Sequence, residues 1–92
     1  MKVLTDQEFV NTRKGPVVIK SQTCPRCEVF LKMPELANAI VYIFSPRSSD
    51  EVRARLQAAG ILSVPAVLDC GTETAMSGEP DELLRFIELI SK

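Results

Sequence analysis

The sequence contains no histidine, and this absence removes several kinds of active site. One chain without histidine cannot build a mixed cysteine–histidine zinc site or a nucleophilic cysteine–histidine dyad. It also lacks the side chain that most often acts as a general base near neutral pH. Nucleophilic or acid–base chemistry in this chain therefore has to come from other residue types.

Excess charge and long apolar runs are also missing. The formal net charge is −1 and no basic run occurs, so a nucleic-acid partner is not expected. No apolar stretch approaches the length of a membrane span, so no membrane partner is expected either. The opening residues, Met1 to Asp6, lack the apolar segment of a signal peptide and carry an early acid, which favours a cytoplasmic protein. At 92 residues and 46% apolar composition, the sequence predicts one domain over residues 1–92, with a small core.

Cysteine is present in an odd number, three, and two of the three lie close together. A secreted disulfide scaffold normally has an even set at wider spacing. In a reducing compartment, a close pair such as Cys24 and Cys27 is more often catalytic or metal-binding than structural. Cys70 is expected in a turn, as a small residue without a catalytic role. Regulatory oxidation or dimer formation is the alternative, because exposed thiols are readily oxidised.

Hydrophobic periodicity and turn residues predict the order helix, strand, helix, strand, helix, strand, strand, helix. The first two strands should be parallel and the last two should form an antiparallel hairpin, with helices on both faces of the sheet. Thr5 and Glu8 form a capping box at the first helix, and Ser48 is expected to cap the third. The predicted helices are residues 5–14, 25–37 with an interruption at Pro34, 48–60, and 80 onward; the predicted strands are 17–20, 40–44, 65–68 and 72–76.

Cys24-Pro25-Arg26-Cys27 falls at the predicted turn from a strand into a helix. Unpaired N–H groups and the dipole at a helix N-terminus favour a thiolate, and a lowered thiol pKa makes a cysteine a usable nucleophile. Arg26 adds a positive charge between the two cysteines. We expect Cys24 to be the exposed nucleophile. Cys27, one turn into the helix, should face the interior and resolve a mixed disulfide.

Two other interpretations of the pair remain open: a structural disulfide, or half of a four-thiolate zinc site. The zinc site would need a dimer, since one chain offers only Cys70 as a further thiol.

Four features together resemble the glutaredoxin family, in its dithiol form. They are Gln7 to Asn11 in the opening helix, Thr23-Cys24-Pro25-x-Cys27, Val64-Pro65, and Ser77-Gly78 followed by Asp81. The resemblance implies an α/β, thioredoxin-like fold with a four-stranded mixed sheet, helices on both faces and an extra N-terminal helix. It further implies that Pro65 is cis, which would bring the Val64 backbone beside the thiols.

The resemblance also implies a site for glutathione. The helix start at Gly78 would bind one carboxylate and Asp81 the ammonium group. Ordinary helix punctuation is the alternative for both residues, and solvated surface charge is the alternative for the basic candidates. The remaining binding candidates, with Arg55 as a further cation for the second carboxylate, are Lys20, Gln22, Thr23, Arg53 and Val64.

The chain departs from the family pattern at several positions. Arg26 replaces the usual tyrosine, Ser63 and Ser77 replace threonine and glycine, and Lys20 lies one residue early. True thioredoxins are a poorer match. They carry tryptophan before the first cysteine, where this chain has Thr23, and a buried acid where it has Val18.

These observations predict a thiol–disulfide oxidoreductase that reduces protein disulfides or glutathione mixed disulfides through Cys24 and Cys27, with Pro25, Arg26 and Pro65 in support. Glutathione is the expected reductant, no bound cofactor or metal is expected, and the protein should be a monomer. One alternative is a redoxin that passes electrons from thioredoxin reductase to ribonucleotide reductase. An alternative of another class is a metal-binding or iron–sulfur module, although such glutaredoxin-like modules tend to have a single cysteine in the site.

Overall fold

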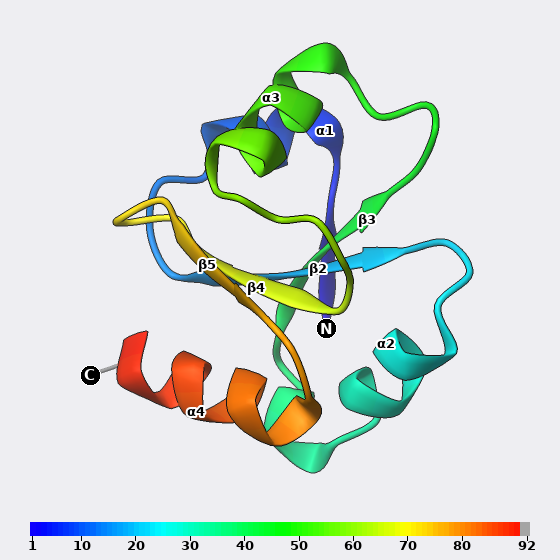
Figure 1. The fold of residues 1–92 in the computed structure, drawn as a ribbon, viewed down its shortest axis with the longest axis vertical. Helices are drawn as coiled ribbons and strands as arrows, with labels where there is room; N and C mark the ends of the chain where they lie inside the picture. The colour runs from blue at the N-terminus through cyan, green and yellow to red at the C-terminus, as the bar shows by residue number, and fades with distance from the viewer. Residues whose placement is uncertain (91–92) are drawn as a thin grey trace.

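The computed structural model describes residues 1–90 as a mixed five-stranded sheet with helices packed on both faces (Figure 1). The strands lie in the order β1-β3-β2-β4-β5. The strands are β1 (Lys2–Leu4), β2 (Pro16–Ser21), β3 (Ile40–Phe44), β4 (Ala66–Asp69) and β5 (Thr74–Ser77). The helices are α1 (Asp6–Asn11), α2 (Pro25–Leu31), α3 (Asp50–Ala58) and α4 (Pro80–Ile90), with a 3₁₀ turn, η1 (Pro34–Leu36), after α2.

The two faces of the sheet are covered by different helices. Helices α1 and α3 lie over one face, and α2 and α4 lie over the other (Figure 1). Alternate side chains of β2 divide between the two cores: Val17 and Ile19 join the cluster under α1 and α3, and Val18 joins the cluster under α2 and α4. This alternation is the period of two that any β-strand imposes, and it decides which functional residues can meet.

The predicted α/β class and the predicted strand directions are confirmed. β2 pairs with β3 in parallel, and β4 pairs antiparallel with both β2 and β5. The interruption at Pro34 is also confirmed, because α2 ends before it and a short 3₁₀ turn starts there. A proline in a continuing helix would clash with the carbonyl four residues earlier, so the chain restarts instead.

The sheet has one strand more than predicted, because residues Lys2–Leu4 form β1, parallel to β3. The backbone N–H of Lys2 donates to the Ala39 carbonyl at 3.0 Å, and the N-terminal amine donates to the Ala37 carbonyl at 2.9 Å. Three residues are too short to show an alternating pattern in the sequence. The prediction of a four-stranded sheet is therefore wrong, because it omits this edge strand.

Helix ends differ from the predictions by one to three residues. The capping box is confirmed: the Thr5 hydroxyl accepts from the Glu8 N–H at 3.1 Å, and the Glu8 carboxylate accepts from the Thr5 N–H at 3.0 Å. Helix α1 ends at Asn11 rather than near residue 14. Ser49, not Ser48, caps α3, because its hydroxyl accepts from the Val52 N–H.

The Ser48 hydroxyl instead lies 2.7 Å from the Tyr42 hydroxyl and accepts from the Ser45 N–H at 3.0 Å. The predicted hairpin is confirmed, with both of its strands displaced toward the C-terminus: β4 covers Ala66–Asp69 and β5 covers Thr74–Ser77.

Within residues 1–90, no helix combines the length and the apolar character needed to cross a bilayer.

Candidate active site

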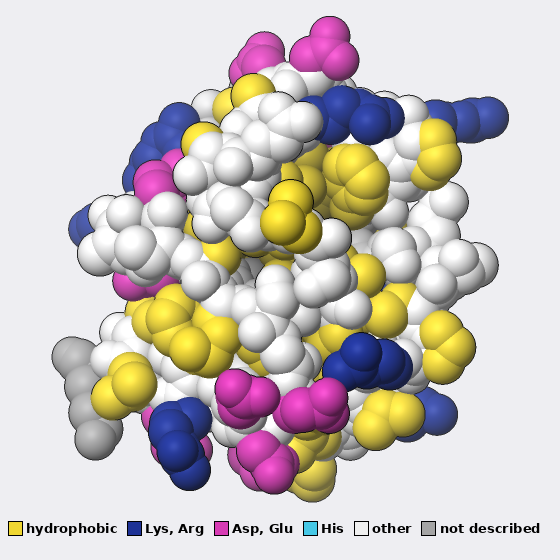
Figure 2. Space-filling view, viewed as in Figure 1, with side chains coloured by type: hydrophobic (Ala, Val, Ile, Leu, Met, Phe, Trp, Pro, Cys, Tyr) yellow, Lys and Arg dark blue, Asp and Glu magenta, His cyan; other side chains and the backbone are white. Residues whose placement is uncertain are grey.

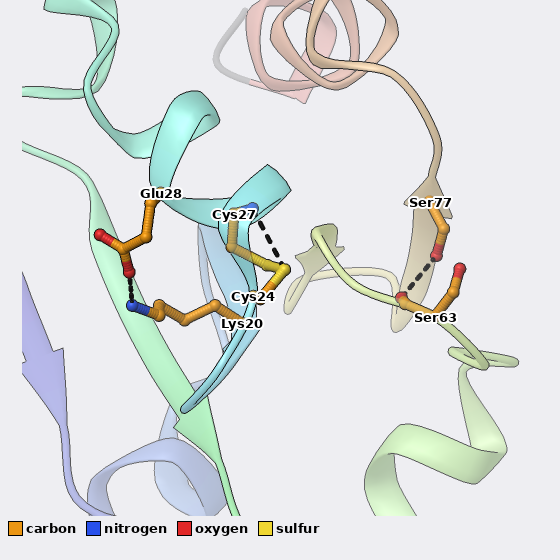
Figure 3. Close-up of a disulfide and its surroundings, with 6 residues drawn as sticks. All are labelled: Lys20, Cys24, Cys27, Glu28, Ser63 and Ser77. Atoms are coloured by element: carbon orange, nitrogen blue, oxygen red, sulfur yellow. Dashed lines mark hydrogen bonds and ion pairs between the residues drawn. A yellow bond between two sulfur atoms is a disulfide. The ribbon is translucent and has the colours of Figure 1, made fainter.

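The two close cysteines form a disulfide at the N-terminus of α2 (Figure 3). Cys24 is the residue that caps the helix, and its Sγ accepts a hydrogen bond from the Cys27 N–H at 3.1 Å. Pro25 occupies the first helical position, where its missing N–H costs nothing. The Cα atoms of the two cysteines are 5.2 Å apart, within the range that a disulfide spans.

The two sulfur-bearing residues differ in exposure. Cys27 is fully buried, with 0% of its surface exposed, whereas Cys24 is half-buried. An incoming thiol or disulfide can therefore reach the Cys24 side of the bridge and not the Cys27 side. The same asymmetry suits an attacking and a resolving thiol, because only the attacker has to contact the substrate.

The loop before β4 lies across from Cys24. The peptide bond between Val64 and Pro65 is cis, as the sequence resemblance implies. The antiparallel pairing of Ile19 with Ala66, continued by two residues, brings Val64 opposite Ser21, three residues before Cys24. Figure 3 shows the Cys24 sulfur on the side of α2 that faces this loop. The Ser77 hydroxyl donates to the Ser63 carbonyl at 3.2 Å, which ties the loop to the end of β5.

Arg26 is turned toward the start of α4 rather than left free in solvent. Its Nη2 donates to the Glu79 Oε1 at 2.8 Å, although both side chains are exposed. An exposed pair of this kind contributes about 0–1 kcal/mol to stability. Its effect here is positional, since it connects the turn between the cysteines to the residue that precedes α4.

The start of α4 is rich in carboxylates. Gly78 has φ +155°, and a Cβ at this position would lie 3.2 Å from the Glu82 Oε1. The same Oε1 accepts from the Glu79 N–H at 3.3 Å, so a carboxylate of the chain already uses this donor. Asp81 is exposed in the first helical turn. Figure 2 shows acidic side chains gathered over the start of α4, with a basic side chain next to them.

A groove of about 390 Å³ opens on the α3 side of the sheet, beside the loop that precedes β4. Its lining is mainly apolar and contains a single charged side chain, that of Arg53. The lining residues are Ile19, Ser21, Phe44, Arg53, Leu56, Gln57, Ile61, Leu62, Ser63 and Val64. The structure therefore brings two of the predicted binding residues, Arg53 and Val64, into one depression.

Lys20 lies on the opposite face of the sheet from this groove. It follows Val18 in the alternation of β2, and its Nζ forms a close ion pair with Glu28 of α2 (Figure 3). The Lys20 side chain is only 13% exposed, and the hydrogen bond that it donates holds the pKa of Glu28 below its ordinary value. Ser21, the next residue, faces the groove instead. Lys20 and Arg53 therefore do not converge on a single carboxylate.

Gln22 and Thr23 are exposed in the turn between β2 and Cys24. Arg55 is 9% exposed and points into the protein, where it donates to the Phe9 carbonyl and to the Thr12 carbonyl at 2.7 Å. It also forms two hydrogen bonds with the Glu73 carboxylate. Arg55 is thus a structural residue and not a cation available to a ligand.

Cys70 is buried, with 2% exposure, in the cluster under α1 and α3. Burial raises the pKa of its thiol. The alternative of a regulatory oxidation assumes that the Cys70 thiol is exposed, and this assumption is wrong. Among residues 1–90, no three cysteine, aspartate or glutamate side chains gather in a way that could hold a metal ion.

Two contacts of the site carry no signal in the sequence. Glu79 meets Arg26 across 53 positions, and Ser77 meets Ser63 across 14, so neither contact follows from local spacing. The placement of Lys20 does have a signal. Counting alternate residues along 17–21 places it with Val18 and not with Ile19.

No protein-family model matches the chain, and no curated protein matches it in sequence. Among solved structures, the crystal structure of thioredoxin from Aeropyrum pernix is similar, with a TM-score of 0.59 at 17% sequence identity. The similarity covers 94% of this chain and 84% of that one. The chain has the thioredoxin fold. A dithiol at the N-terminus of a helix is chemically able to exchange with an external disulfide.

Proposed function

We propose that the chain is a thiol–disulfide oxidoreductase that acts through Cys24 and Cys27. The observation that carries the proposal is the asymmetric disulfide at the start of α2: a partly exposed Cys24 beside the Val64–Pro65 loop and a fully buried Cys27. A structural staple has no need of a partly exposed cysteine next to an open groove.

The reaction begins from the reduced dithiol. The Cys24 thiolate attacks one sulfur of the substrate disulfide, and the other substrate sulfur leaves with the bonding electrons and takes a proton. Cys27 then loses its proton and attacks the Cys24 sulfur, which releases the second substrate thiolate. Two electrons move from the dithiol to the substrate, and the Cys24–Cys27 disulfide is the product. The N–H of Cys27, which donates to the Cys24 Sγ, stabilises the attacking thiolate.

Glutathione is the electron donor that the sequence resemblance implies, and thioredoxin reductase is the alternative donor, in a redoxin that feeds ribonucleotide reductase. The crowd of carboxylates at the start of α4 favours the alternative, because Glu82 already accepts from the N–H at which a glutathione carboxylate would bind. We therefore propose thioredoxin reductase as the donor and keep the glutaredoxin assignment, with glutathione as donor, as the alternative. A monomeric, cytoplasmic state is also part of the proposal.

Replacing each cysteine in turn tests the mechanism. We expect Cys24→Ser to abolish turnover of a protein disulfide. We expect Cys27→Ser to stop after the first attack and to accumulate a covalent adduct, visible as a mass increase equal to one substrate half. Cys70→Ser is the matched control and should retain turnover. Full activity of the Cys24→Ser variant would contradict the proposal.

A further inference from the structure

The groove beside the loop before β4 has features that a solvent-filled depression does not need. Leu62, which lines it, is 94% exposed, the highest exposure of any large apolar side chain among residues 1–90. Ile61 and Val64 line the groove next to it, and the lining also includes Ser21, three residues before Cys24. Figure 2 shows hydrophobic side chains in a hollow beneath α3, with basic side chains along its edge. An apolar group of a bound molecule could be buried here while its disulfide lies at Cys24.

Arg53, the one charged residue of the lining, is held in place but is not neutralised. Its Nε donates to the Ser48 carbonyl at 3.3 Å and its Nη2 to the Pro46 carbonyl at 2.6 Å, and its guanidinium carbon lies 5.4 Å from the centre of the Phe44 ring. A guanidinium has five N–H donors. Three of them therefore have no partner among residues 1–90, and no carboxylate of those residues lies within ion-pair distance of Arg53.

The charges on the other side of Cys24 are of opposite sign. Glu79 neutralises Arg26, and Asp81 and Glu82 add negative charge at the start of α4. An acidic group near a bound disulfide is therefore attracted toward the Arg53 side and repelled from the α4 side. The two sides differ in polarity as well, since only the Arg53 side offers the apolar groove.

We infer that the groove binds a segment of a disulfide-bonded protein substrate that carries an apolar side chain and an acidic side chain close to the reactive cysteine. The apolar side chain fills the groove next to Leu62, and the acidic side chain pairs with Arg53. This inference rests on the proposed function and names the substrate class for the same site. Glutathione carries carboxylates but no apolar side chain, so it could pair with Arg53 but could not fill the apolar part of the groove.

Blocked peptide disulfides test the inference in single turnovers. The chain is reduced, freed of reductant, and mixed with disulfide-linked peptides whose two residues flanking cysteine are Leu and Glu, Leu and Gln, Leu and Lys, or Ser and Glu, each pair in both orders. The released peptide thiols are separated and quantified over time. We expect the better Leu–Glu order to react about fivefold faster than its Gln counterpart, and the Lys peptide to react more slowly still. The Ser–Glu peptide should be about tenfold slower than Leu–Glu, since it buries no apolar side chain.

Arg53→Gln should remove the preference, so that the Leu–Glu and Leu–Gln peptides react at the same rate in this variant. Arg53→Lys should keep part of the preference, because it retains the positive charge. This variant therefore distinguishes the effect of the charge from the effect of the hydrogen bond that Arg53 donates to the Pro46 carbonyl. Arg47→Gln is the matched control, because it removes the same charge from a neighbouring residue outside the groove lining, and it should keep the preference in full.

Equal rates for all peptides would overturn the inference and leave the oxidoreductase proposal standing. The same holds if Arg47→Gln removes the preference as fully as Arg53→Gln, or if a glutathione mixed disulfide reacts as fast as Leu–Glu. Failure to reduce any peptide or glutathione disulfide would overturn the proposed function, and the inference with it.

Discussion

Tyr42 connects the core to the turn before α3, to whose carbonyls Arg53 donates. Its ring stacks on Phe9, with centroids 4.6 Å apart, and its hydroxyl donates to Asp6 at 2.7 Å and contacts Ser48. Burial raises the pKa of Tyr42 to about 12. The folded hydroxyl thus keeps its proton at a pH where an unfolded tyrosine, with a pKa near ~10, has lost it.

This difference predicts a loss of stability at high pH. The contribution of Tyr42 is fully present below pH ~10 and disappears as the pH rises to about 12, for a total of about 2–3 kcal/mol. Denaturant unfolding at several pH values would measure it. Tyr42→Phe is the control, since it should lower stability at neutral pH by about 1–2 kcal/mol through the lost hydrogen bonds and should unfold with a flatter pH profile. An identical slope in both proteins would contradict the prediction.

Cys70 should be slow to react, since its thiol is buried and its pKa is raised. In Cys24→Ser/Cys27→Ser, we expect labelling by a thiol reagent at pH 8 to be at least about tenfold slower than in the same protein unfolded in urea. Rapid labelling of the folded variant would show that the Cys70 region opens readily.

Between elements, Arg55 fastens α3 to the end of α1 and to the β4–β5 hairpin. It donates to the Phe9 and Thr12 carbonyls and pairs with Glu73, while its guanidinium lies 4.8 Å from the centre of the Phe9 ring. Arg55→Met removes these donors. The Phe9 carbonyl keeps the Thr12 N–H as a donor, whereas the Thr12 carbonyl and the Glu73 carboxylate lose their Arg55 partner. We expect it to lower the free energy of unfolding by about 2–4 kcal/mol, measured in urea.

Arg47→Met, at an exposed position, should change the free energy of unfolding by no more than about 0.5 kcal/mol. Arg55→Lys should recover little of the loss, because a single ammonium group cannot replace a fork that reaches three partners. If Arg55→Lys proves as stable as the native protein, the fork geometry does not matter.

The elements themselves were largely predictable from the sequence, and their ends were not. The apolar runs at 17–20 and 40–44 indicate strands, and Pro34 marks a real interruption. β1 was missed because its only signal is its pairing with β3. The cap of α3 was misplaced by one residue because two adjacent serines have equal capping propensity, and only the long-range contact of Ser48 with Tyr42 separates them.

At the scale of the whole molecule, the sequence predicted which cysteines form the pair but not what surrounds it. The motif places Cys24 and Cys27 at a helix start, whereas the groove is assembled from β2, β3, α3 and the loop before β4. Arg53 and Val64 meet there, while Lys20 and Arg55 are directed elsewhere by strand alternation and by burial. Contacts of this kind depend on the tertiary fold and not on local spacing.

The electron donor is also a property of the whole molecule, and a direct comparison identifies it. The oxidised protein is incubated with glutathione and its reductase, or with thioredoxin reductase, and NADPH consumption is followed. We expect the faster rate with thioredoxin reductase, because Glu79, Asp81 and Glu82 oppose the carboxylates of glutathione. The absorbance spectrum of the purified protein, which should show no visible band, tests the iron–sulfur alternative. A faster rate with glutathione would identify the glutaredoxin reaction.

The alternation of side chains along β2 offers a simple way to change the proposed substrate preference. The side chains of Lys20 and Ser21 lie on opposite faces of the sheet. Exchanging the two residues would therefore move a cation from the α2 side into the groove. We expect such a swap to install a second anchor for carboxylates next to Arg53 without altering composition or net charge. Changes at two adjacent residues would thus convert a groove with one cationic side chain into a groove with two.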